Sequence, residues 1–341
     1  MKTKALLTPR PFGSIPLMDA FKMNDPQNKN SVIYALVGPT CTHKSNIAIE
    51  FAKKYPFEII SADSRLIYKE MDIGTSKPSD AEMKEVPHHM INLAEPSENY
   101  SVGLYKKEAE EKINNIFSRG KIPLFVGGTG LYLNSVLLGL SIPEVKPDLS
   151  LRRELKDFTQ EELYGNLTKL DPKAAEIIHK NDNFRTIRAL EVIYKTNKLF
   201  SELKSIKELP FKVIWIGLTY KERELHTEKI KQRAEAFCKN GFIEEVKCLL
   251  DKYGELDLFK RTIGYLEVMQ YLKNLLNKDK LVEKITLNTK RLVKRQMTWF
   301  RSNKEIKWEY LDDMDYKGIL ERVFNLIEEG SLAKTSSISI S

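Results

Sequence analysis

The chain has 341 residues, of which 42% are hydrophobic, and it carries a formal net charge of +8 with a sequence pI near 9.0. This length and apolar content suit one large α/β domain with an insertion, or two domains, and the basic charge permits a polyanionic partner without proving one. No apolar run approaches the roughly 18 residues that a membrane span requires, so no membrane association is expected.

Three cysteines, Cys41, Cys238 and Cys248, have neither the spacing of a metal site nor that of a disulfide framework. We therefore expect a reducing compartment and predict a cytoplasmic protein. Residues 1–30 are expected to be a disordered tail, because their acidic residues and single arginine argue against an organelle-targeting peptide. The alternation of Ser and Ile over residues 335–341 indicates a second tail.

The first predicted strand, residues 32–37, runs into a near-complete phosphate-binding loop. The spacing fits the motif G-x-x-x-x-G-K-[ST], and apolar residues at helical spacing follow over residues 45–54. Backbone N–H groups of such a loop, together with the N-terminus of the helix, can cradle phosphate oxygens. The alternative is a strand-to-helix turn with an incidental Lys-Ser pair. The predicted diphosphate-binding residues are Gly38, Pro39, Thr40, Cys41, Thr42, His43, Lys44 and Ser45.

Ser45 is the predicted metal ligand, because its hydroxyl can bind a magnesium ion, Mg²⁺, beside the phosphates. His43 stands where the motif has its second glycine. Since glycine allows positive φ and close backbone approach, we expect a histidine there to cost strain.

Three further strands are predicted over residues 57–61, 122–126 and 213–218. Helical patterns lie between them, notably over residues 102–118, which predicts a parallel sheet flanked by helices: an α/β, phosphate-loop NTPase-like fold. Ligands of such sheets bind beyond the carboxyl ends of the strands. The phosphate loop, Asp63 and the turn Gly127-Gly128-Thr129-Gly130 are therefore expected to converge on one cleft.

The chain changes character near residue 141, where two prolines open a charged helical region without a convincing strand. We predict an all-helical insertion over residues 141–207 within an α/β core of residues 31–140 and 208–315. Residues 316–341 are predicted to be a C-terminal helix and tail.

Asp63 follows a predicted strand, and its carboxylate could accept a proton or orient a nucleophile. A helix N-cap is an equally good interpretation. Basic residues cluster elsewhere: Arg185 and Arg188 share a helix face, and residues 290–295 carry basic pairs at a spacing of four. Such a run is either a solvated face or a surface that tracks phosphates.

Taken together, these motifs resemble the tRNA dimethylallyltransferase family, also called tRNA isopentenyltransferases. The resemblance extends over roughly residues 32–310, in the order of the family. Its segments are VGPT…KS (37–45), ISADSRLIYKEMDIGTSKP (60–78), VPHHMINLAEPSENYSV (86–102), PLFVGGTGLYL (123–133), NDNFRTIRALEV (181–192) and KRLVKRQMTWFR (290–301).

The resemblance implies transfer of a dimethylallyl group from its diphosphate to N6 of the adenosine 3′-adjacent to the anticodon, in tRNAs that read codons beginning with U. It implies Mg²⁺ as cofactor, dimethylallyl diphosphate and the anticodon stem-loop of tRNA as substrates, and a monomer. The catalytic residues that it implies are Asp63, Thr129, Lys44 and Arg233. The tRNA contacts that it implies are Asp63, Ser64, Arg65, Leu66, Thr129, Arg152, Phe184, Arg185, Arg188, Arg261, Gly264, Tyr265, Lys290, Arg291, Lys294 and Arg295.

Two departures from the family pattern are expected to weaken binding: His43 replaces a glycine of the loop, and Leu266 stands where many relatives have arginine. Three rival functions are a phosphoryl-transferring kinase, a prenyltransferase acting on free adenine nucleotides, and a tRNA-binding protein that lost catalysis through His43. The helical insertion and the basic helix favour tRNA over a small nucleotide.

Overall fold

The computed structural model describes residues 31–143, 145–203, 206–312 and 314–335. The tails predicted at residues 1–30 and 335–341 lie outside these residues, except that Thr335 ends the last helix. The chain divides into two compact units, and we describe each by itself. One contains residues 31–99, 111–130 and 210–335 of the described chain, and the other contains residues 100–110 and 131–209.

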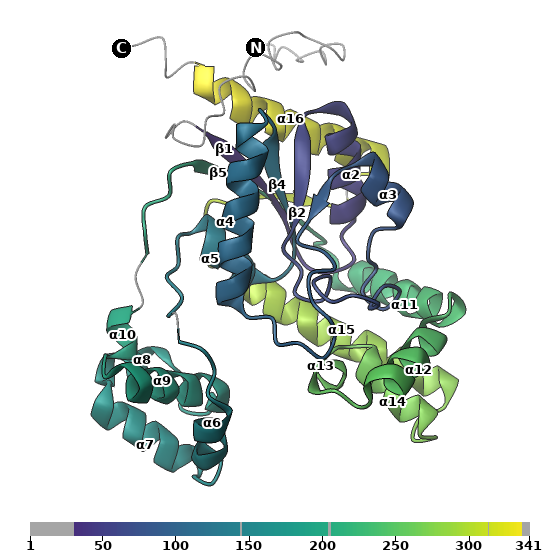
Figure 1. The fold of residues 1–341 in the computed structure, drawn as a ribbon. Helices are drawn as coiled ribbons and strands as arrows, with labels where there is room; N and C mark the ends of the chain where they lie inside the picture. Colours follow the sequence, from purple (N-terminus) through teal and green to yellow (C-terminus); the bar gives the residue numbers. More distant parts are fainter. Residues whose placement is uncertain (1–30, 144, 204–205, 313, 336–341) are drawn as a thin grey trace, which may run out of the picture. The chain divides into compact units, whose positions relative to one another are not determined.

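The first unit is built on a six-stranded sheet whose strands are all parallel (Figure 1). The strand order is β3-β2-β4-β1-β5-β6. The strands are β1 (Val32–Val37), β2 (Phe57–Ser61), β3 (His88–His89), β4 (Ile122–Gly127), β5 (Lys212–Thr219) and β6 (Lys307–Tyr310). This confirms the predicted α/β fold with a parallel sheet flanked by helices.

The sequence prediction missed the two edge strands. β3 has only two residues, which is too short for a periodic pattern, and β6 mixes Lys and Glu with two aromatic residues. Both strands are defined by hydrogen bonds to a neighbouring strand, which is β2 for β3 and β5 for β6. The local sequence alone does not indicate that such a neighbour is present.

The helices of the first unit are α2 (Lys44–Lys54), α3 (Asp80–Glu85), α11 (Arg223–Lys239), α12 (Phe242–Tyr253), α13 (Asp257–Lys260), α14 (Tyr265–Leu272), α15 (Lys278–Phe300) and α16 (Tyr316–Thr335). α4 (Val102–Ser118) and α5 (Gly130–Leu137) have residues in both units. None of the helices in the described part of the chain is both long and apolar enough to cross a bilayer.

One face of the sheet is covered by α2 and α16, and this layer forms one hydrophobic core. Alternate residues of β1, among them Tyr34 and Leu36, face these helices, because side chains of a strand point to opposite faces in turn. The rings of Phe51 in α2 and Phe324 in α16 pack with centroids 4.1 Å apart. Burying this apolar surface stabilises the unit by about 25 cal/mol per Å², and it holds α2 against the sheet.

The second unit is helical. Its other helices are α6 (Leu149–Leu155), α7 (Gln160–Leu170), α8 (Pro172–Ile177), α9 (Asn183–Thr196) and α10 (Phe200–Leu203). Their inward-facing aliphatic side chains, such as Leu163 and Leu190, form a separate core. Several of these helices begin at residues that accept hydrogen bonds from the first turn, including Asp148, Thr159 and Asp171.

The register of the sheet positions the candidate site residues. Val37 at the end of β1 pairs with Gly127 at the end of β4, and Ser61 at the end of β2 pairs with Val126. The segments that follow these three strands therefore leave the same edge of the sheet side by side.

Candidate active site

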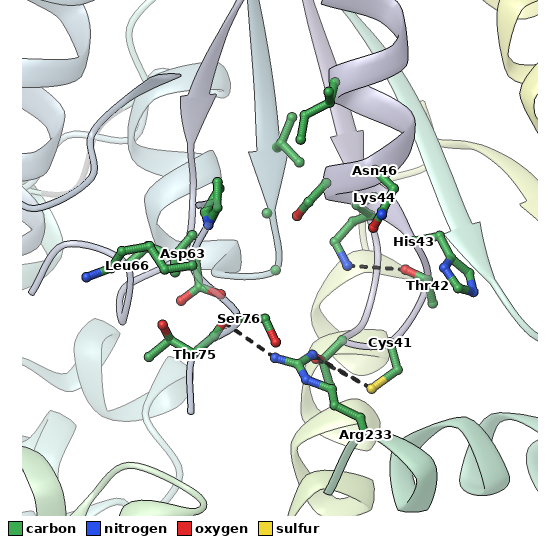
Figure 2. A pocket seen from close by; sticks show the side chains of 18 of the residues that line it. Cys41, Thr42, His43, Lys44, Asn46, Asp63, Leu66, Thr75, Ser76 and Arg233 are labelled. Atoms are coloured by element: carbon green, nitrogen blue, oxygen red, sulfur yellow. Dashed lines mark hydrogen bonds between the residues drawn. The ribbon is translucent and has the colours of Figure 1, made fainter. Parts of the chain in front are cut away.

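A cavity of about 520 Å³ lies at this edge of the sheet, within the first unit (Figure 2). The phosphate loop lines one wall, and Asp63, Leu66 and residues 75–78 line another. Residues 126–128 form the floor, while Arg233 of α11 and Gln296 of α15 approach from the helices. The convergence expected for the phosphate loop, Asp63 and the GGTG turn is thus what the structure shows.

The phosphate loop requires glycine at its start. Gly38 has a φ of 144°, and a Cβ there would lie 2.2 Å from the carbonyl oxygen of Leu218. His43 precedes α2 in the left-handed conformation, with φ 57° and ψ 15°. Histidine is one of the few residue types enriched in that region, so the loop keeps the backbone turn that a glycine would make.

The His43 side chain leaves the cavity open. Figure 2 shows its ring directed away from Asp63 and from the Lys44 side chain. The ring lies edge-on to Tyr316 instead. Burial, with Lys229 and Lys44 nearby, lowers the pKa of His43, so the imidazole is neutral at pH 7. Whether His43 weakens diphosphate binding stays a prediction.

Lys44 folds back over the loop. Its Nζ donates to the carbonyl oxygen of Pro39 at 2.6 Å and to Oγ1 of Thr42 at 3.2 Å. Burial lowers the pKa of Lys44 to about 8; Arg233 adds to this effect, whereas Cys41 and Asp63 oppose it. An anion in the cavity would favour the charged ammonium group.

Arg233 connects α11 to the loop. Its Nη1 donates to Oγ1 of Thr40 at 2.5 Å and lies 3.7 Å from Sγ of Cys41, and its Nη2 lies 3.4 Å from the carbonyl oxygen of Thr75. The guanidinium is also stacked over the ring of Phe237, 5.0 Å from its centroid. These contacts fix a positive charge at the wall of the cavity.

Asp63 and Thr129 lie on adjoining loops. Oδ1 of Asp63 accepts from the backbone N–H of Arg65 at 2.8 Å, and residues 64–67 form a turn. The alternative of a helix N-cap is therefore wrong, because no α-helix begins here in the described chain. Oγ1 of Thr129 accepts from the N–H of Ser64 at 3.0 Å, so Thr129 supports the loop that carries Asp63.

The sequence prediction missed several residues of the site. Gln296 bridges the phosphate loop and the GGTG turn. His226 donates from Nε2 to the carbonyl oxygen of Thr40 at 2.8 Å, and Lys229 lines the cavity one turn before Arg233. Gln296 lies within residues 290–301, where the basic residues gave the clearer indication of function in the sequence.

Apart from residues 63–66 and Thr129, the predicted tRNA contacts in the first unit fall into two groups. Lys290, Arg291, Lys294, Arg295 and Arg261 are exposed. Tyr265 is fully buried, and its hydroxyl donates to Glu245 at 2.6 Å. The Glu245 carboxylate also accepts from the backbone N–H groups of residues 72–74, so Tyr265 supports the DIGT turn. Gly264, with φ 92°, allows the chain to turn into α14.

In the second unit, Phe184 and Arg185 are exposed. Arg152 and Arg188 instead hold the buried carboxylate of Glu191, through Nε and Nη2 of Arg152 at 2.8 Å each and through Nη1 of Arg188 at 2.5 Å. Both arginines remain partly accessible, with side-chain exposures of 25% and 22%. They therefore have a structural role whether or not they also reach RNA.

Comparison with known proteins identifies the family. A family model described as IPP transferase matches residues 66–303, and one described as isopentenyl transferase matches residues 31–95. The tRNA dimethylallyltransferase of Caldanaerobacter subterraneus subsp. tengcongensis is 41% identical over 305 residues, which cover 86% of this chain and 97% of that relative. The tRNA dimethylallyltransferase of Gloeothece citriformis is also 41% identical, over 87% of this chain and 96% of its own length.

Solved structures agree. The full-length tRNA isopentenylpyrophosphate transferase from Bacillus halodurans is 33% identical and superposes with a TM-score of 0.68, covering 92% of this chain and all of its own. A eukaryotic dimethylallyltransferase described as acting on tRNA is 28% identical, with a TM-score of 0.72 over 83% of this chain and 74% of its own. The resemblance seen in the sequence motifs is confirmed: the chain belongs to the tRNA dimethylallyltransferase family.

Proposed function

We propose that this chain transfers a dimethylallyl group from dimethylallyl diphosphate to N6 of the adenosine 3′-adjacent to the anticodon, in tRNAs that read codons beginning with U. The observation that carries the proposal is that one cavity brings together a phosphate loop, a cationic side chain from α11 and the Asp63 carboxylate. These are an anion-binding wall and a proton acceptor facing each other, as alkyl transfer from a diphosphate requires.

The diphosphate would lie against the phosphate loop. N–H groups at the start of α2, the ammonium group of Lys44 and the guanidinium of Arg233 would stabilise negative charge as it develops on the leaving group. Because water has limited access to Lys44, its charge would interact more strongly there than at an exposed surface.

Mg²⁺ would assist by binding diphosphate oxygens. No group of three or more His, Cys, Asp and Glu side chains suited to a metal occurs among the described residues, so an ion held by protein alone is not supported. The exposed hydroxyl of Ser45, next to Lys44, fits an ion that takes one protein ligand and keeps its other positions for phosphates and water.

Asp63 would accept the proton from N6. In the reaction the bond from N6 to C1 of the dimethylallyl group forms, the bond from C1 to the diphosphate oxygen breaks, and the N6 proton passes to the carboxylate. One carboxylate oxygen is held by the N–H of Arg65, which fixes the orientation of the group. Thr129 holds the same loop and would keep Asp63 at the wall of the cavity.

The adenine must leave the anticodon loop to reach such a cavity, because its N6 is otherwise stacked among neighbouring bases. The exposed basic residues of α15 supply a surface for the RNA backbone close to the cavity. We propose that the helical insertion, residues 141–207, clamps the anticodon stem. We propose that the protein acts as a monomer. Three free thiols suit the reducing cytoplasm, where the substrate tRNA occurs.

The test is transfer of labelled dimethylallyl from its diphosphate to an unmodified tRNA that carries an adenosine 3′ of the anticodon, with Mg²⁺ present. We expect label at that adenosine in the wild type and none with Asp63→Ala. Asp251→Ala, which removes an exposed carboxylate from α12, is the matched control and should retain the label.

Two outcomes would overturn the proposed activity, and a third would overturn the role of Asp63. Tight tRNA binding without transfer or diphosphate binding would indicate a catalytically silent tRNA-binding protein. Equal or better transfer to free AMP would indicate a nucleotide prenyltransferase. Label retained in Asp63→Ala would remove Asp63 from the chemistry.

A further inference from the structure

Gln296, in the penultimate turn of α15, joins two segments that are distant in the chain. Its Oε1 accepts from the backbone N–H of Thr40 at 3.1 Å, and its Nε2 donates to the carbonyl oxygen of Gly128 at 3.1 Å. The first partner belongs to the phosphate loop, which lines one wall of the cavity, and the second to the GGTG turn, which lies at its floor. A single amide therefore links these two sides of the cavity.

The glycines of the turn make room for α15. A Cβ at Gly128 would lie 2.3 Å from Nε2 of Gln296, and a Cβ at Gly130 would lie 2.1 Å from the indole ring of Trp299. Real Cβ atoms do not approach this closely. Gly128 and Gly130 therefore allow the turn to lie close to the end of α15.

Thr40 is held from three directions. Gln296 accepts from its N–H, His226 donates to its carbonyl oxygen, and Arg233 donates to its hydroxyl oxygen. Burial of His226 lowers the pKa of the imidazole, which keeps the ring neutral while its N–H donates. The position of the phosphate loop therefore depends on α15 as well as on α11.

The same helix carries the exposed basic residues. Arg295, Lys294, Arg291 and Lys290 precede Gln296 by one to six residues in a helix that is continuous from Lys278 to Phe300. RNA held by these side chains would restrain α15 directly beside its contact with the cavity. When bound RNA already restrains α15, less conformational entropy is lost on binding of the diphosphate, and the diphosphate binds more tightly.

We infer that Gln296 is a positioning residue that couples the two substrates: RNA bound to the basic side of α15 tightens the binding of dimethylallyl diphosphate through the Gln296 amide. This inference rests on the proposed function. Because coupling between two ligands is reciprocal, the diphosphate must tighten RNA binding by the same factor.

The experiment measures the dissociation constant of dimethylallyl S-thiolodiphosphate, an unreactive analogue, by titration calorimetry with Mg²⁺, in the absence and presence of a saturating anticodon stem-loop RNA. In the wild type the RNA should tighten analogue binding about fivefold or more, which is the lower end of usual allosteric coupling. In Gln296→Met, which keeps the volume but removes both hydrogen bonds, the ratio should fall to within about twofold of one.

Gln270→Met is the matched control. Gln270 also bonds to α15, since its Oε1 accepts from Nζ of Lys284 at 2.8 Å, but neither residue lines the cavity. Its coupling ratio should equal that of the wild type. Gln296→Glu keeps the acceptor for Thr40 and loses the donor to Gly128, and it should give an intermediate ratio. It also provides a second test if Gln296→Met fails to fold.

A purely structural role would weaken both ligands without changing the ratio, and that result would overturn the inference. A wild type without coupling would overturn it as well. Failure of the proposed function is distinguishable, because it would show as absence of label transfer by the wild-type chain. If only the inference fails, transfer persists and Gln296→Met couples the ligands as the wild type does.

Discussion

The rings of His43 and Tyr316 lie edge to face, with centroids 6.1 Å apart and an interplanar angle of 70°. This contact joins the residue that replaces the loop glycine to the first residue of α16. It places the imidazole against the helix layer that covers the sheet. His43 can therefore act in two ways, through the backbone strain at its positive φ and through the packing of its ring.

The first prediction concerns that strain. His43→Gly should tighten dimethylallyl diphosphate binding by roughly fivefold to thirtyfold, because a left-handed conformation costs an L-residue about 1–2 kcal/mol, and about 1.4 kcal/mol corresponds to a factor of ten in affinity. His43→Ala is the control, since it removes the ring but keeps the Cβ, and it should bring no gain. Calorimetric dissociation constants for the three proteins decide the matter; unchanged affinity in His43→Gly would sink the strain argument.

A second prediction follows from Lys44, whose pKa in the folded chain is about 8 because of burial. Since a bound anion favours the charged amine, ligand binding should take up a proton near and above pH 8, and affinity should fall as pH rises further. The effect of Lys44 on folding has the opposite sign. Between about pH 8 and the ordinary lysine pKa, the unfolded chain binds more protons than the folded chain, so the contribution of Lys44 to the free energy of unfolding increases with pH.

Calorimetry of dimethylallyl diphosphate binding at pH 8.5, in two buffers with different ionisation enthalpies, measures the proton uptake directly. Lys44→Arg should abolish it, because the guanidinium stays charged across this range. Equal apparent enthalpies for the wild type in the two buffers would show that Lys44 is not the group that titrates.

The third prediction separates structure from recognition in the second unit. Glu191 is buried and receives Arg152, Arg188 and the N–H of Asp148. Glu191→Gln should lower the free energy of unfolding by about 3–5 kcal/mol, because it removes one partner of a buried ion pair. Burial opposes ionisation of the Glu191 carboxyl group, but the hydrogen bonds from Arg152, Asp148 and Arg188 outweigh it and lower the pKa of Glu191. The stabilisation is therefore present above the ordinary glutamate pKa and should be lost as the pH falls below it.

Arg185→Gln is the comparison, since Arg185 is exposed and pairs only with nearby Asp182, at 3.6 Å, among the ion pairs of the described chain. It should leave the free energy of unfolding within about 0.5 kcal/mol of the wild type. Denaturant unfolding of both variants provides the measurement. An equal loss of stability in the two variants would contradict a stabilising role for the ion pairs around Glu191.

The fourth prediction tests the basic side of α15. Lys294→Gln should weaken tRNA binding and reduce the slope of log affinity against log salt by about one, the signature of one lost phosphate contact. Lys280→Gln, on the first turn of the same helix, should leave the slope unchanged. Filter binding at several salt concentrations gives both slopes, and identical slopes would count against an RNA surface at Lys294.

The fifth prediction concerns α16. Phe324 is 5% exposed and packs on Phe51, so Phe324→Ala should cost about 3–5 kcal/mol of stability by leaving a cavity. Glu321→Ala, on the exposed side of the same helix, is the control and should have little effect. Thermal unfolding that ranks the two variants equally would place α16 outside the core.

Sequence alone determined the strand, loop and helix of the proposed phosphate site, because the apolar run of residues 32–37 and the spacing from Gly38 to Ser45 are local features. It also determined the family, whose motifs are contiguous segments. The position of Asp63 at the cavity followed as well, since parallel strands place their carboxyl ends at one edge.

Only the tertiary structure decided what holds those segments in place. Gln296 meets Thr40 across 256 positions of sequence, and Arg188 turns toward Glu191 although its spacing from Arg185 indicated a shared basic face. Helical spacing says which residues share a side of a helix, but it does not say what that side contacts. A buried carboxylate captures an arginine because leaving either charge unpaired is costly, and that balance is set by the folded surroundings.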